Sequence, residues 1–191
     1  MDLLISNIEK YVNLSAAEKA ILPAFWSEIK VKKNEFLLRA GEICQRDIFV
    51  IEGALKIYII NEHTAKEEII SFAVKDWWAS DLTSFHEKVP SKLNIQALKT
   101  TLALQISKQN FDRMLEAIPS LERYFREILQ SNVAAWIERT YNRNSSDSEA
   151  RYQEFIRKYP KIVEEVPQYL IASYLGMSAE MLSKIRARNT I

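Results

Sequence analysis

Basic and hydrogen-bonding side chains recur at helical spacing near the end of the chain. From Ala179 onward, Lys184, Arg186 and Arg188 accompany a single acid, Glu180, so the local charge is +2. The whole chain of 191 residues carries only +1, from 26 basic and 25 acidic residues. Lys and Arg can reach guanine acceptors or phosphates, and Glu can accept a hydrogen bond from cytosine. The pattern predicts a small, local DNA-binding surface rather than a generally basic protein.

Two short helices joined by a glycine turn would position these side chains. The segment from Gln168 to Leu175 predicts a helix that ends at Gly176, a residue that readily takes the left-handed conformation. Ser178 offers a side-chain oxygen to cap a second helix that begins at Ala179. Helices in this order form a helix–turn–helix. The candidate DNA-contacting residues are Gln168, Tyr169, Ser178, Glu180, Ser183, Lys184, Arg186 and Arg188.

Upstream of this segment, the periodicity of apolar residues changes twice. Residues 1–29 have helical spacing, and Ser15 with Glu18 matches a capping box. Residues 30–106 break into short β-like runs separated by turns, two of which contain glycine, and such runs are typical of a jelly-roll sandwich. The runs are residues 35–39, 47–52, 54–60, 67–73, 93–98 and 102–106.

The longest apolar-periodic stretch follows Pro119 and predicts a long helix to about Tyr141, before a polar, loop-like segment over 142–148. The fold class is therefore α+β: a sensory domain at 1–118, a connecting helix at 119–142 and a helix–turn–helix domain at 143–191. An apolar stripe can cover its own sandwich and also pair with a second copy. The alternative is a helix packed wholly within one subunit. The expected dimer interface is Leu121, Phe125, Ile128, Leu129, Asn132, Val133 and Trp136.

This order of elements resembles the Crp/Fnr family, the cyclic-AMP receptor and fumarate–nitrate regulator proteins. The segment from Pro167 to Arg188, PQYLIASYLGMSAEMLSKIRAR, is especially similar to Crp/Fnr regulators of Bacteroidetes-like bacteria. The resemblance implies a homodimeric transcription regulator on double-stranded DNA, with RNA polymerase and an unidentified small-molecule effector as further partners. Family members read bases through a Glu and a basic residue four positions later, which match Glu180 and Lys184. The Arg that usually precedes the Glu is Ala179 here.

The resemblance also implies a cyclic nucleotide cassette, and this chain departs from it. The family cassette contains a Gly-Glu pair and, further along, an Arg followed by a Ser, and the Arg binds the phosphate. In this chain, the Gly-Glu pair is replaced by Ser80 and Asp81, and the Arg and Ser are replaced by Ser91 and Lys92. A buried phosphate without its bidentate partner is a costly desolvated charge, and Lys lacks the planar fork of Arg. We therefore expect no tight cyclic-AMP binding and no cofactor.

On the long helix, the nucleotide-sensing positions of the family match Asn132, Trp136 and Ile137. The side chains of Trp136 and Ile137 cannot replace the hydroxyl groups that contact a purine in the family. The pocket either takes another small molecule or is filled by side chains such as Trp77, Trp78 and Trp136. The candidate pocket residues are Ser80, Asp81, Leu82, Ser91, Lys92, Asn132 and Trp136.

Other compositional features exclude several classes of protein. The single cysteine, Cys44, excludes an internal disulfide framework and a four-cysteine metal site. No apolar run approaches the roughly 20 residues of a membrane span, and the N-terminus does not resemble a signal peptide, so we expect a cytoplasmic protein. His63 and His86 lack partners at ligand spacing, so no catalytic residues, metal site or enzyme activity are expected. The alternatives are a ligand-binding or protein-interaction module without DNA binding, and an enzyme of cupin type.

Overall fold

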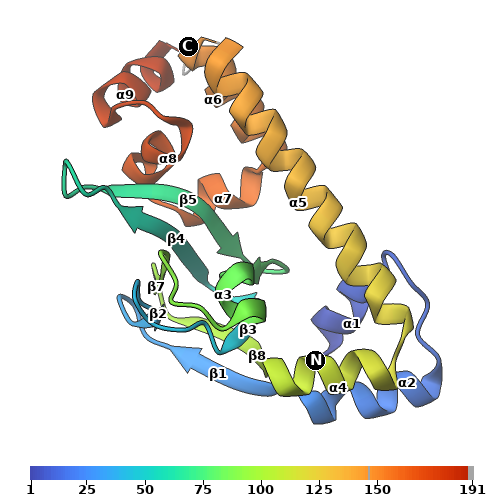
Figure 1. The fold of residues 1–191 in the computed structure, drawn as a ribbon. Helices are drawn as coiled ribbons and strands as arrows, with labels where there is room; N and C mark the ends of the chain where they lie inside the picture. Colours follow the sequence, from blue (N-terminus) through green and yellow to red (C-terminus); the bar gives the residue numbers. More distant parts are fainter. Residues whose placement is uncertain (146, 189–191) are drawn as a thin grey trace.

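The computed structural model describes residues 1–145 and 147–188 and contains a β-sandwich between residues 27 and 107. Within these residues, eight strands make two four-stranded antiparallel sheets, in the orders β1-β8-β3-β6 and β2-β7-β4-β5 (Figure 1). The strands are β1 (Ser27–Val31), β2 (Phe36–Leu38), β3 (Arg46–Glu52), β4 (Ala54–Ile60), β5 (Glu67–Val74), β6 (Trp78–Ala79), β7 (Asn94–Ala97) and β8 (Thr101–Ser107). The predicted α+β class with an N-terminal sandwich is confirmed.

Helices lie at one end of the sandwich and beyond its outer face, linked by one long helix, α5, that runs beside both groups (Figure 1). They are α1 (Asp2–Ile8), α2 (Ala16–Ile21), the 3-10 helix η1 (Leu22–Phe25), α3 (Leu82–Glu87), α4 (Lys108–Ala117), α5 (Ser120–Ser145), α6 (Ser148–Lys158), α7 (Pro160–Glu165), α8 (Gln168–Leu175) and α9 (Ala179–Arg188). Among the helices of the described residues, none is both long and apolar enough to cross a bilayer.

Two predicted boundaries are wrong. The helical spacing of the first zone ends at Phe25, and Ser27 begins β1, which pairs with β8. Only Val31 of β1 is buried, so its alternation is too short to be recognised in the sequence. The polar segment 142–148 is not all loop, because α5 continues to Ser145 and Asp147 caps α6 by accepting a hydrogen bond from the Ala150 N–H (2.8 Å).

Local signals elsewhere are confirmed. The Ser15 hydroxyl accepts from the Glu18 N–H (3.2 Å), and the Glu18 carboxylate accepts from the Ser15 N–H (2.7 Å), which completes the capping box. Gly53 links β3 to β4 at φ +105°, and a Cβ there would lie 2.4 Å from the Thr101 hydroxyl. Glycine is therefore required at this turn for both space and conformation.

A buried hydrogen-bond chain fixes the start of α5 against the sandwich. Tyr124, which is fully buried, donates to Asn7 Oδ1 (2.5 Å) and accepts from the Trp78 indole N–H (3.0 Å). Burial raises the pKa of the Tyr124 phenol above its ordinary value, so the hydroxyl keeps its proton and remains a donor. The chain joins α5 to α1 and β6 and so sets which face of α5 points inward.

Candidate DNA-binding surface and sensor pocket

The turn between α8 and α9 has the geometry that the sequence predicts. Gly176 adopts the left-handed conformation at φ 68°, and the Met177 N–H donates to the Ala172 carbonyl (3.0 Å), which closes α8. The Ser178 hydroxyl accepts from the Met181 N–H (3.1 Å) and caps α9. The two helices are thus held by local backbone chemistry at a fixed angle to each other.

One face of α9 packs inward and the other faces solvent. Leu182 and Ile185 are buried in a core that they share with α8. The candidate DNA-contacting residues on this helix are all exposed: Glu180, Ser183, Lys184, Arg186 and Arg188. Successive residues advance 100° around a helix, so Glu180, Ser183, Lys184 and Arg188 share one face and Arg186 flanks it. The charged side chains of α9 therefore lie on its exposed face, which is the face that would enter a DNA groove.

The Glu180 carboxylate is held in its ionised form. Hydrogen bonds from its own N–H and from the Ser178 hydroxyl lower its pKa, as do the charges of Lys184 and Lys66. Lys66 belongs to the β4–β5 hairpin, so this hairpin lies within electrostatic range of α9. No local sequence signal could reveal that the hairpin lies near the face of α9 that carries the candidate DNA-contacting residues.

The candidate residues on α8 differ in their exposure. Tyr169 is 62% exposed at the first turn of the helix. Gln168 is half-buried, and within the described residues its side-chain oxygen has no hydrogen-bond partner. The structure places both on the same short helix as the turn, with Tyr169 the more accessible of the two.

Side chains from α5 and α8 bind the free edge of the sandwich at β5. Arg139 of α5 donates to the carbonyls of Ile70 (2.6 Å), Ile69 (3.2 Å) and Tyr174 (2.8 Å), and its guanidinium lies 3.9 Å from the Tyr174 ring centre. Ile70 is the extra residue of a β-bulge, because Tyr58 pairs with Ile69 and Ile57 with Ser71. A bulge leaves backbone groups outside the ladder, and Arg139 satisfies them.

The helical group also buries apolar surface on this edge. Ser173 of α8 donates to the Glu67 carbonyl (3.4 Å) and accepts from the Ile69 N–H (3.3 Å). Around these bonds, Tyr58 and Phe72 of the sheet share one hydrophobic core with side chains from α6 to α9. A strand edge that would otherwise be open for pairing is thereby covered, and the helix–turn–helix is attached to the sandwich.

The two residues that replace the ligand-binding pair of the cyclic nucleotide cassette bond to each other. Asp81 Oδ2 accepts from the Ser91 hydroxyl (2.7 Å), while Asp81 Oδ1 caps α3 by accepting from the Ser84 N–H (3.1 Å). Ser91 is buried, whereas Leu82 and Lys92 are exposed. Ser80, Asp81 and Ser91 lie close together, and their polar groups form hydrogen bonds within the protein.

A buried carboxyl lies beside this cassette. Asp47 of β3 accepts from the Ile48 N–H (3.0 Å) and hydrogen-bonds to the Ser80 side chain, and it is 5% exposed. Burial raises the pKa of Asp47 to about 7, against the weaker opposing effect of these hydrogen bonds. The carboxyl thus changes charge near neutral pH at the base of the cassette.

Aromatic rings fill the space between the sandwich and the start of α5. Trp78 contacts Trp26, Phe49 and Phe125, with ring centres 5.3 to 5.6 Å apart. Trp78 thus packs among side chains, which is the arrangement that the second alternative for the pocket describes. Trp77 instead packs against Tyr159, which lies between α6 and α7, and their ring centres are 5.7 Å apart.

The expectation that Trp136 fills the pocket is wrong. Its side chain is 63% exposed and does not fill the sandwich, because the anchoring of Tyr124 directs this part of α5 outward. Asn132 is exposed on the same stretch. Nearer the start of α5, Leu121 is buried and Phe125 and Ile128 pack against the sandwich core, so the predicted interface set is divided between the two ends of the helix.

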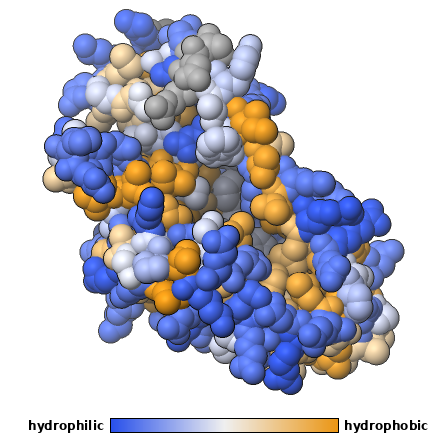
Figure 2. Space-filling view, viewed as in Figure 1, coloured by the Kyte–Doolittle hydropathy of each residue, from blue (hydrophilic) through white to orange (hydrophobic). Residues whose placement is uncertain are grey.

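The outer part of α5 carries an apolar stripe, which Figure 2 shows as an orange band along the helix. Its members are between 48% and 68% exposed and recur at helical spacing: Leu129, Val133, Trp136, Ile137 and Tyr141. Exposed apolar patches of this kind mark interaction surfaces. The side of α5 that carries Arg139, which holds β5, is a different side from the stripe.

Comparison with known proteins agrees with this geometry. Residues 28–117 match the cyclic nucleotide-binding domain family. The fold matches FixK2 from Bradyrhizobium japonicum, with a TM-score of 0.74 and 13% identity over 85% of this chain and 83% of that one. The sandwich is thus similar to a cyclic nucleotide-binding domain, and the whole chain has a Crp/Fnr-like fold. No curated protein matches it.

Other proteins of the Crp/Fnr fold align over most of their length. CLP from Xanthomonas campestris, described as a c-di-GMP responsive global regulator, has a TM-score of 0.71 and 14% identity over 92% of both chains. A CooA mutant from Carboxydothermus hydrogenoformans has a TM-score of 0.68 and 17% identity over 96% of this chain and 83% of that one. The Crp/Fnr fold therefore extends from the sandwich through α5 to the terminal helices.

Proposed function

We propose that this protein is a sequence-specific, DNA-binding transcription regulator that acts as a homodimer in the cytoplasm. The observation that carries the proposal is the helix–turn–helix at Gly176, which presents Glu180, Lys184 and Arg188 together on one exposed face. In this role residues 1–118 form the sensory part, residues 119–142 pair the two copies and residues 143–191 contact DNA. The structural neighbours include transcription regulators, which supports the same assignment.

Charge reversal on α9 tests the proposal. Replacing Lys184, Arg186 and Arg188 together by Glu should abolish retention of double-stranded DNA, because attraction to phosphates becomes repulsion. Retention by the unaltered protein should weaken steeply with salt, as release of counterions requires. Binding is measured by fluorescence anisotropy on DNA obtained by selection from a fragment library.

A second triple substitution is the matched control. Lys30, Lys32 and Lys33 are exposed on and beside β1, and their change to Glu alters the net charge by the same amount. This control should retain DNA. Equal binding by the α9 variant would instead favour the alternative function, a ligand-binding or protein-interaction module without DNA binding.

The cassette geometry predicts no tight binding of cyclic AMP. The Asp81–Ser91 hydrogen bond occupies the groups that would contact the nucleotide, and Ser91 cannot supply the bidentate pairing that an Arg at this position would give a phosphate. Titration calorimetry of the purified protein with cyclic AMP should therefore show no saturable heat in the micromolar range. Affinity at micromolar concentration or tighter would contradict this prediction. If the titration shows no binding, any effector that controls DNA binding or contact with RNA polymerase is a molecule other than cyclic AMP.

A further inference from the structure

The β4–β5 hairpin extends toward the side of the molecule that carries α8 and α9 (Figure 1). Its turn, residues 61–66, is closed by the Asn61 N–H, which donates to the Lys66 carbonyl (2.9 Å). The Asn61 side-chain oxygen also accepts from the N–H groups of His63 and Thr64 (both 2.9 Å). Local hydrogen bonds therefore give the turn a defined shape and place Lys66 directly before β5.

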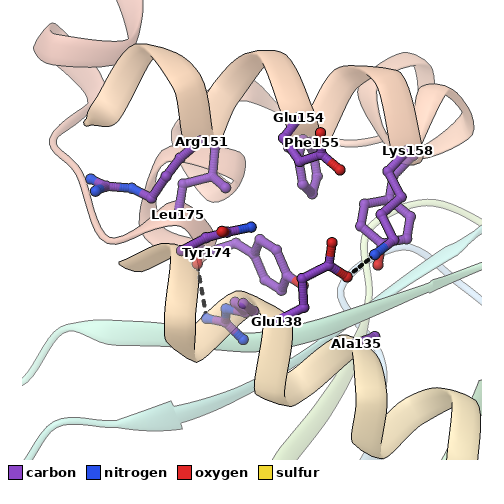
Figure 3. Close-up of a pocket in the computed structure, with 11 residues that line it drawn as sticks. Ala135, Glu138, Arg151, Glu154, Phe155, Lys158, Tyr174 and Leu175 are labelled. Atoms are coloured by element: carbon purple, nitrogen blue, oxygen red, sulfur yellow. Dashed lines mark hydrogen bonds and ion pairs between the residues drawn. The ribbon is translucent and has the colours of Figure 1, made fainter. Parts of the chain in front are cut away.

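The base of this hairpin is fixed to the first helix of the helix–turn–helix. The Ser173 hydroxyl of α8 donates to the Glu67 carbonyl (3.4 Å) and accepts from the Ile69 N–H (3.3 Å). The helical group is also joined to the long helix, because Lys158 of α6 pairs with Glu138 of α5, as the dashed line in Figure 3 shows. Since the glycine turn connects α8 directly to α9, the hairpin has a defined position relative to α9.

The positive charge of Lys66 lies near the start of α9. Lys66 is exposed, and its amino group makes no hydrogen bond or ion pair with the residues that the structure describes. Its charge helps to lower the pKa of the Glu180 carboxyl, so Lys66 lies within electrostatic range of the first turn of α9. Lys184 acts on the same carboxyl from within α9. Two cations, one from the hairpin and one from the helix, are thus close to Glu180.

Three acids on the same hairpin differ in their availability. Glu67 pairs with the buried Lys56, and Glu68 accepts from a side-chain amide in the turn (2.6 Å). Glu62 is exposed in the turn. An anion beside the hairpin would therefore be attracted by Lys66 and repelled by Glu62, so the two residues give opposite expectations.

We propose, on the basis of the DNA-binding function proposed above, that Lys66 contacts a phosphate beside the groove that α9 enters. The β4–β5 hairpin is then part of the DNA-binding surface. The first residues of a recognition helix contact base edges, and basic groups around them contact the phosphates that border the groove. Lys66 lies beside that first turn. A phosphate contact of this kind adds affinity without sequence preference.

The salt dependence of DNA binding by Lys66→Gln tests this contact. Anisotropy is measured with the full chain at about 50 to 200 mM salt, on a selected duplex and on a shuffled duplex of the same composition. Each phosphate contact contributes about 0.9 to the slope of log affinity against log salt, so the slope should fall by about that amount per copy. Affinity at about 0.1 M salt should fall at least about fivefold, by a similar factor on both duplexes.

Lys75→Gln is the matched control. Lys66 directly precedes β5 and the exposed Lys75 directly follows it, so both substitutions remove one positive charge from opposite ends of one strand. These positions are about 30 Å apart at about 3.4 Å per residue, well beyond the screening length of about 10 Å at 0.1 M salt. The control should keep the slope and affinity of the unaltered protein.

The outcomes distinguish this contact from the function on which it rests. If the unaltered protein binds DNA and Lys66→Gln has the same slope, the contact is overturned and the DNA-binding function stands. If the unaltered protein binds neither duplex, both are overturned.

Two further variants separate a phosphate contact from an effect through Glu180. The shuffled duplex is used, because its binding does not need base contacts. Lys66→Gln should lose the same slope in a Glu180→Gln protein as in the unaltered one. Glu62→Gln removes an acid from the turn and should raise affinity about twofold or more, an effect that misfolding does not produce. Loss of the Lys66 effect in the Glu180→Gln protein, or no gain from Glu62→Gln, would show that the hairpin does not face the DNA.

Discussion

Replacing Val133 or Trp136 by Glu should convert the proposed dimer into monomers and greatly weaken the proposed DNA binding. Both side chains belong to the exposed apolar stripe of α5, and Trp136 is 63% exposed in the single chain. In a two-fold interface each substitution acts twice, and a charge buried there without a partner is strongly unfavourable. We expect the dimer dissociation constant to rise at least about 100-fold, measured by analytical ultracentrifugation.

The loss of DNA affinity should follow from the loss of pairing. Two linked recognition helices gain avidity that one copy lacks, on the order of 10² or more. Ser131 is exposed on the side of α5 opposite the stripe, so Ser131→Glu is the matched control and should remain dimeric. If Trp136→Glu stays dimeric at the same protein concentration, the stripe of α5 does not form the interface.

Asp47→Asn is expected to stabilise the protein at pH 8 but not at pH 4. The Asp47 pKa is about 7 in the folded protein, against an ordinary value of 3.8. Well below pH 3.8 the carboxyl is protonated in both states, and at pH 4 only a small part of the effect has developed. As the pH rises toward 7, only the unfolded chain ionises, so the free energy of unfolding falls. Above pH 7 the accumulated loss is about 4 kcal/mol.

Chemical denaturation at pH 4 and pH 8 measures this difference. The Asn side chain has similar size and can accept the same hydrogen bond from the Ile48 N–H, but it does not titrate. Asp112→Asn is the control, because Asp112 forms a largely exposed pair with Lys108 and should change stability by less than about 1 kcal/mol. A stability difference for Asp47→Asn that is the same at both pH values would contradict the prediction.

Local signals explain what could be predicted from the sequence. Gly176 and Ser178 specify the end of one helix and the start of the next through contacts within a few residues, so the helix–turn–helix was predictable. The β4 boundaries followed from an apolar run next to Gly53. The cassette substitutions at Asp81 and Ser91 were visible too, but their mutual hydrogen bond required the three-dimensional structure.

Long-range geometry explains what could not be predicted. Trp136 lies at a position that resembles a pocket residue, but the rotation of α5 is set by Tyr124 and its bonds to Asn7 and Trp78. The role of Arg139 depends on a bulge at Ile70, which is 69 residues away in the chain. Neither a periodic pattern nor a capping motif encodes such a contact.

Helix α5 is attached at two separate points, so a small change in its tilt at one point produces a larger movement at the other. Tyr124 holds the helix at one end through its hydrogen bond to Asn7. Arg139 binds the bulged strand β5 and α8 at a point about 22 Å further along the helix, at a rise of 1.5 Å per residue. A tilt of about 5° at the Tyr124 pivot would move the Arg139 end by about 2 Å, enough to break hydrogen bonds at that end. A small disturbance among the aromatic rings around Trp78 would therefore become a larger displacement of α8 and α9, which carry the candidate DNA-contacting residues.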